Sequence, residues 1–119
     1  MRTFVIELGT GVDLHGQDPT RAAIKAVRDA FAHVSLPGLR QVAGVEDLDS
    51  VAIEVTLGVP PEVGTADAAR VAEQFPFGQV RVQVVPGGLL VAGDAFRPEL
   101  GDRSDHILIV NAAIRVRVP

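Results

Sequence analysis

Apolar and polar residues alternate with a period of two over most of the chain and follow a helical period in two segments. The alternating segments predict strands at 3–8, 50–58, 79–85, 89–92 and 106–118. Asp18-Pro19 is a typical helix start, because an aspartate accepts backbone N–H bonds at the cap and proline suits the first turn. We therefore expect a helix from Thr20 to about Val34 and a shorter one from Thr65 to about Gln74.

The resulting order, βαβαβββ, favours a single α+β domain over residues 1–119, with one mainly antiparallel sheet and two helices on one face. In the first strand Phe4, Ile6 and Leu8 share one face, and Glu7 belongs to the other. The polar strand positions predict a charged second face of the sheet, which is either solvated or an interface between subunits. Its members are Glu7, Glu54, Thr56, Arg81, Gln83, Arg115 and Arg117.

Composition narrows the classes of function. Hydrophobic residues make up 47% of the chain and charged residues 22%, as in a globular domain. The net charge of −4 and the lack of a basic run argue against nucleic acid as a partner. Without cysteine there is no disulfide or thiolate metal site. The apolar runs are too short to span a membrane and no signal peptide precedes the first strand, so we expect a cytoplasmic protein with no membrane association.

The segment from Gly9 to Asp18 joins the first strand to the first helix and is predicted as a loop. Backbone N–H groups and short polar side chains converge on ligands in such loops. Asp13 and His15 flank Leu14, so in an extended stretch their side chains point the same way. Together they could bind a divalent metal ion, or act as an acid–base pair in which the aspartate orients the ring. Alternatively, Asp13 bonds the loop backbone and His15 packs on the helix.

The other candidate ligand-binding residues are loop glycines and polar groups near the two ends of the helix. They are Gly9, Gly11, Gly16, Asp18, His33 and Ser35. His33 could be a third metal ligand, but the intervening helix separates it from His15 by roughly 20 Å, so it would have to come from another subunit. Structural alternatives are a helix cap for Asp18 and a favourable position near the helix C-terminus for His33.

The last predicted loop holds further polar candidates. Asp102, Asp105 and His106 could join a site from another subunit. A polar turn before the final strand is the alternative interpretation.

The run Gly9-Thr10-Gly11-Val12-Asp13-Leu14-His15-Gly16 is similar to the G-x-G-x-D-x-H-G signature of a conserved hypothetical family named after a listerial "Lin" locus. The resemblance covers nearly the whole chain and implies no assigned activity. It continues at Asp18, 20–23, 28–30, 33–36, 55–59, 84–89 and 110–113.

Two weaker resemblances concern chemistry and architecture. Asp13 and His15 are similar to two zinc ligands of methylerythritol cyclodiphosphate synthase, although the motif of that enzyme's third ligand has no counterpart here. The predicted architecture resembles that of trimeric enzymes with sites between short α+β subunits.

The sequence leaves two hypotheses open. In the first, the protein is a homo-oligomeric enzyme that binds a small polar substrate at the Gly9–Asp18 loop, where Asp13 and His15 bind a divalent metal or act as acid and base. In the second, it is a non-catalytic small-molecule-binding or assembly module, and the glycine loop is structural.

Overall fold

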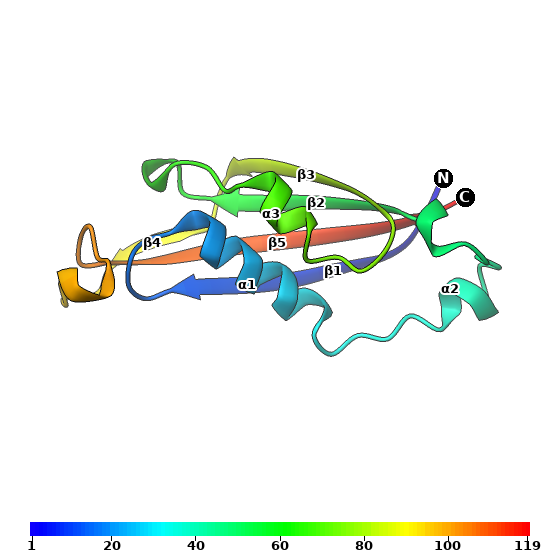
Figure 1. The fold of residues 1–119 in the computed structure, drawn as a ribbon, viewed down its shortest axis with the longest axis horizontal. Helices are drawn as coiled ribbons and strands as arrows, with labels where there is room; N and C mark the ends of the chain where they lie inside the picture. The colour runs from blue at the N-terminus through cyan, green and yellow to red at the C-terminus, as the bar shows by residue number, and fades with distance from the viewer.

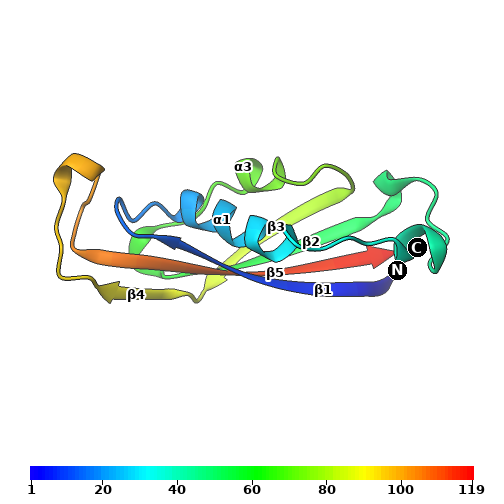
Figure 2. The same cartoon turned by 90° about the horizontal axis from the view of Figure 1, so that it is seen from below.

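The computed structural model describes residues 1–119 as one five-stranded sheet with the helices α1 and α3 on one of its faces (Figures 1 and 2). This confirms the predicted α+β domain and its mainly antiparallel sheet. The strands are β1 (Arg2–Asp13), β2 (Ala52–Val59), β3 (Gln79–Pro86), β4 (Leu89–Ala92) and β5 (His106–Val118). The helices are α1 (Pro19–Phe31), the unpredicted α2 (Gly38–Gln41) and α3 (Ala68–Ala72). No helix combines the length and hydrophobicity needed to cross a membrane.

Strand β5 is the centre of the sheet. It pairs antiparallel with β1 along one side, and with β2 and β4 along the other. Strand β3 runs parallel to β2 and forms an edge, which gives the order β1-β5-β2-β3. The molecule is elongated, 51 × 23 × 19 Å, and both chain termini lie at the same end of the sheet (Figure 1).

The core lies between the sheet and the helix layer. Helix α1 packs on β1 and β5, and α3 lies beside α1 over β3. The buried apolar residues of β2 and β5 alternate as predicted: Ile53, Val55, Leu57, Val59, Leu108, Val110, Ala112, Ile114, Val116 and Val118. Helix α1 begins at the predicted cap, where Asp18 accepts bonds from the N–H groups of Thr20 and Arg21. It ends at Phe31, so Val34 lies beyond it and is 44% exposed.

Strand β1 extends to Asp13, so Gly9 and Gly11 lie in a strand and not in the predicted loop. Both face α1 at very short range. A Cβ atom on Gly9 would lie 2.6 Å from the backbone nitrogen of Ala30, and one on Gly11 would lie 2.5 Å from that of Ala26. The structure therefore gives these glycines a packing role, since only a residue without Cβ lets the helix backbone approach so closely.

The glycines also fix which side chains of β1 are buried. Because successive residues of a strand point to opposite faces, Glu7 shares the helix-facing side with Gly9 and Gly11. Glu7 is accordingly only 8% exposed, whereas Ile6 is 49% and Leu8 74% exposed on the open face. The prediction that Glu7 belongs to the outer charged face was wrong, because the requirement for glycine at the helix contact outweighs the polarity of one carboxylate.

The open face is therefore more basic than the sequence suggested. Glu54 is bonded to Arg117 at 3.2 Å and lies near Arg115 at 3.9 Å. Its partner in the parallel pair with β3 is Arg81. With Glu7 on the other side, one glutamate remains among three arginines on this face.

The outer edge of β1 is covered by side chains of α1. Asp29 accepts a hydrogen bond from the N–H of Thr10 at 2.9 Å, and Lys25 donates to the carbonyl oxygen of Val12 at 2.9 Å. An edge strand exposes unpaired backbone groups that can pair with another chain. These two bonds satisfy part of the edge and tie it to the helix.

We expect Gly11→Ala to lower the free energy of unfolding by at least about 3 kcal/mol, because the added methyl group collides with helix backbone that cannot rotate away. Urea denaturation of the variant and the wild type measures the difference. Thr10→Ala is the matched control on the adjacent, exposed position and should stay within about 1 kcal/mol of wild type. Equal stability of both variants would contradict the close contact.

Candidate functional site

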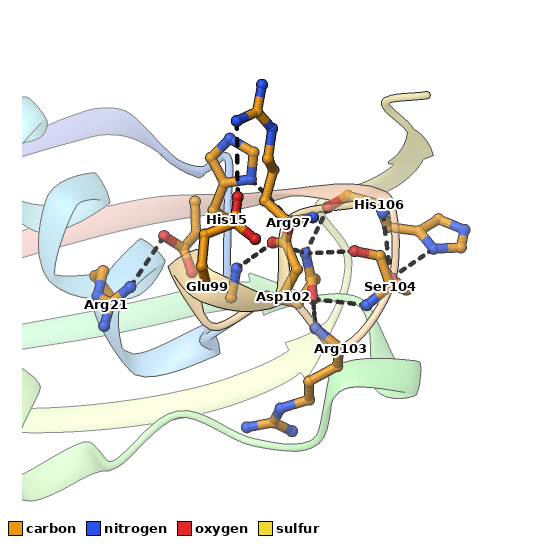
Figure 3. A network of polar contacts seen from close by, with 11 residues as sticks. His15, Arg21, Arg97, Glu99, Asp102, Arg103, Ser104 and His106 are labelled. Atoms are coloured by element: carbon orange, nitrogen blue, oxygen red, sulfur yellow. Dashed lines mark hydrogen bonds and ion pairs between the residues drawn. The ribbon is translucent and has the colours of Figure 1, made fainter. Parts of the chain in front are cut away.

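The carboxylate of Asp102 connects two loops at one end of the sheet: the loop that follows β1 and the loop between β4 and β5 (Figure 3). It lies in the loop between β4 and β5, and its side chain is 1% exposed. His15 Nδ1 at 2.8 Å and the N–H of Gly16 at 2.7 Å bond to it from the loop after β1. Gln17 Nε2 at 3.1 Å and the N–H of Arg97 at 2.8 Å also donate to it. We call this group of five residues the Asp102 cluster.

The surroundings of Asp102 keep it ionised. Burial of the carboxyl group opposes ionisation and alone would raise its pKa. The hydrogen bonds from His15, from the N–H groups of Arg97 and Gly16, and from Gln17 outweigh this effect and hold the pKa well below its usual range. Asp102 is therefore a permanent negative charge at neutral pH, with each donor aimed at it.

Gln17 is the second bridge between the loops, and sequence reasoning missed it. It is 4% exposed, and its amide Nε2 also donates to the carbonyl oxygen of His106 at 2.8 Å. Its Oε1 accepts from the N–H groups of Arg103 at 2.9 Å and Ser104 at 3.3 Å. Its backbone φ of 51° is unusual for a residue other than glycine or asparagine. A buried, fully bonded glutamine has no local sequence signal, because all these partners lie about 85 to 89 positions away, in the loop before β5 and at the first residue of β5.

The chain reaches this arrangement through the turn at Gly16. The φ of Gly16 is +105°, in a region where a side chain is strained, and its N–H points to Asp102. Gly16, one of the predicted ligand-binding glycines, is thus required by the geometry of the turn.

His15 is the member of the Asp102 cluster best suited to proton transfer. Because Nδ1 faces an ionised carboxylate, the neutral ring carries its proton on Nδ1 and leaves Nε2 as a base. Nε2 makes no hydrogen bond within the protein, and the side chain is 34% exposed. The geometry is that of a partly exposed histidine ring oriented by a buried aspartate, with Nε2 left without a protein partner.

Asp13 has partners different from those of His15. It is 3% exposed, accepts from the N–H of Asp18 at 2.8 Å, and lies 3.5 Å from the guanidinium of Arg21. The carboxylate that orients His15 is thus Asp102 and not the predicted Asp13. Nowhere do three or more His, Asp or Glu side chains form a group that could hold a metal ion, so the predicted metal site gains no support.

The remaining predicted residues lie elsewhere. Asp18 caps α1, as its structural alternative stated. His33 follows the far end of α1 and is exposed, roughly 20 Å of helix away from His15. Ser35 lines a separate cavity near the same end. His106 contributes its carbonyl oxygen to Gln17, while its ring bonds Ser104 Oγ at 2.9 Å and leads away from Asp102 (Figure 3).

A small cavity of about 140 Å³ borders the Asp102 cluster. Its lining includes Gln17, Glu62, Leu90, Arg103 and Ser104. The ring of His15 is not part of its lining. A molecule bound at His15 would therefore rest on the outer surface of the two loops.

Comparison with known proteins identifies relatives but no activity. A family model described as "Conserved hypothetical protein (Lin0512_fam)" matches residues 3–116. A crystal structure described as an FtsZ-like protein of unknown function from Nostoc punctiforme is similar to this chain. It is 42% identical, covers 98% of this chain and 95% of its own, and has a TM-score of 0.86. None of the curated proteins matches.

We expect Asp102→Asn to lower the melting temperature by at least about 5 °C near neutral pH, because an NH₂ group would replace an acceptor oxygen that faces N–H donors. The low pKa of Asp102 means that its ionisation stabilises the fold above the unfolded-state pKa of about 4, and that this stabilisation is lost as the pH falls below it.

The difference in melting temperature between the two proteins should therefore be constant near neutral pH and begin to narrow below about pH 4, closing only at the much lower pH at which Asp102 of the folded wild type takes up a proton. Asp105→Asn, on a half-exposed neighbour, should melt like the wild type throughout. A pH-independent difference for Asp102→Asn would contradict an ionised Asp102.

Proposed function

Because the chain belongs to the conserved hypothetical Lin0512 family, whose description assigns no activity, we propose its function from the site: it is an enzyme that transfers a proton to or from a small polar substrate at His15. The observation that carries the proposal is the 2.8 Å bond from His15 Nδ1 to the buried Asp102, which leaves Nε2 free. General acid–base catalysis needs such an oriented histidine within reach of the substrate.

The role of each group follows from its contacts. His15 Nε2 takes or gives the proton. Asp102 is a positioning residue, because it holds the tautomer and orientation of the ring without contacting the substrate. Gln17 and Gly16 keep the two loops together and so support the position of Asp102. Asp13, the other predicted catalytic residue, supports the start of α1 through its bond to Asp18.

The charges near His15 favour an acidic substrate. Arg97 comes from the loop between β4 and β5, lies beside His15 and has a side chain that is 61% exposed (Figure 3), whereas Arg21 is already paired with the buried Asp13. Arg97 lies 3.7 Å from the equally exposed Glu99, an ion pair that contributes little in water. The guanidinium group of arginine binds carboxylates through two parallel, bidentate hydrogen bonds. We therefore take the substrate to be a small organic acid with a C–H group that can lose its proton.

A direct experiment follows proton exchange at carbon. A pool of 2-oxo, 2-hydroxy and 2-amino acids is incubated with the protein in D₂O at neutral pH, and the C–H signals are followed by ¹H NMR. Wild type should exchange or convert at least one acid, and His15→Gln should be slower by about 100-fold or more.

The control for this experiment is His33→Gln, which removes a histidine at the other end of α1 and should match the wild type. Absence of exchange for every acid contradicts the proposal. Equal rates in wild type and His15→Gln contradict it as well, because the reaction would then not depend on this ring.

We retain a homo-oligomer as part of the proposal. Its support is the open face of the sheet, where Leu8 is 74% and Leu89 54% exposed, since large exposed apolar residues on one face are typical of interfaces. Light scattering should give a multiple of 12.5 kDa for wild type and a lower mass for Leu8→Glu. Ala32→Glu, at the exposed C-terminal end of α1 and away from the open face, is the control for added charge and should keep the wild-type mass. A wild-type mass of 12.5 kDa would refute the oligomer.

A further inference from the structure

A second and larger cavity lies at the other end of α1 from His15. It has a volume of about 490 Å³ and is bounded by the sheet, the end of α1, the segment 34–40 and the turn at 75–77. Ten of its fifteen lining residues are hydrophobic. Both its volume and its apolar lining fall within the range of small-molecule sites, which are typically about 300–1,000 Å³.

The walls of the cavity present aromatic rings. Phe31 and Phe75 pack against each other with ring centroids 5.4 Å apart, and Phe77 lies in the same lining. Ile53 and Ile114 belong to the sheet side. Such walls favour a flat or branched apolar ligand over a polar one. Each Å² of apolar ligand surface that is removed from water contributes about 25 cal/mol to the free energy of binding.

Glu7 is the exception in this apolar lining. It is 8% exposed, and neither carboxylate oxygen makes a hydrogen bond or an ion pair within the protein. Its Oε1 is fully buried. Arg40, the basic residue of the lining, is exposed and forms no ion pair with it. Burial raises the pKa of Glu7 above its ordinary value.

A buried carboxylate without a partner is costly, and natural proteins usually supply a donor or a cation for it. Here the chain supplies neither. The missing partner is thus a hydrogen-bond donor, preferably one with positive charge, attached to a body that fits apolar walls. We propose that this cavity binds an apolar primary amine, with the aromatic or aliphatic part among Phe31, Phe75 and Phe77 and the ammonium group on Glu7.

This site is separate from the proposed catalytic one. Glu7 lies on β1 six residues before Asp13, and the cavity lining contains no member of the Asp102 cluster. Occupation of the cavity therefore does not depend on proton transfer at His15.

The experiment is a titration of the full chain with tryptamine, phenethylamine and hexylamine, followed by ¹H–¹⁵N NMR. At least one amine should bind and shift the amide signals around 31–39 and 75–77. Glu7→Gln keeps the shape of the side chain and removes its charge, so it should lower the affinity for that amine by about 10- to 100-fold. Glu54→Gln is the matched control on the open face and should bind like the wild type.

Matched ligands separate the amine from its apolar body. 3-Ethylindole lacks only the amino group of tryptamine, and its binding should not differ between wild type and Glu7→Gln. Indole-3-propionate, which carries a negative charge instead, should bind at least 10-fold more weakly than tryptamine to the wild type.

Three results would overturn the proposal: no shift with any of the amines, shifts elsewhere on the surface, or equal amine affinity of wild type and Glu7→Gln. If Glu7→Gln does not fold, the variant Leu36→Trp tests the site instead. Leu36 is a half-buried lining residue, and an indole there should fill the cavity and abolish amine binding. Unchanged binding in that folded variant refutes the site.

Discussion

The contact between α1 and the two glycines of β1 is the constraint on which the rest of the structure depends. Gly9 and Gly11 let the backbone of α1 lie directly on the strand, at a distance that no Cβ would allow. The small face of the helix, made of Ala22, Ala26 and Ala30, is the other half of this contact. Asp29 and Lys25 then bond the outer edge of the same strand. Close packing of this kind leaves one register and one orientation for the helix.

That contact has consequences at both ends of α1. It decides which alternate side chains of β1 face the helix. Asp13 is therefore buried beneath the start of the helix, and Glu7 is buried near its end. Asp13 finds partners there in the N–H of Asp18 and in Arg21. Glu7 finds none. The same geometric rule therefore produces a satisfied carboxylate in one place and an unsatisfied one in the other, and the second is the chemical anomaly of the molecule.

The Asp102 cluster solves a different problem. The loop that follows β1 and the loop that precedes β5 contain few apolar residues, and one buried carboxylate with four donors holds them together. A charged acceptor strengthens each of these bonds relative to a neutral one. The cluster also fixes the tautomer of His15, so the same bond that stabilises the loops prepares the ring for proton transfer.

The sequence by itself determined the elements whose signals are local: the five strands, the capped helix α1, the inward alternation of β2 and β5, and the family. It also marked His15 as a candidate. Only the tertiary structure decided which face of β1 is buried, because the polarity of Glu7 argued one way and the contacts of Gly9 and Gly11 the other. It also replaced Asp13 by Asp102 as the partner of His15, 87 positions away. Periodicity and helix caps depend on residues a few positions apart in the sequence. The bond between His15 and Asp102 and the cavity at Glu7 depend on distant segments instead. These segments meet only when β1 pairs with β5 in its antiparallel register and α1 packs on the sheet.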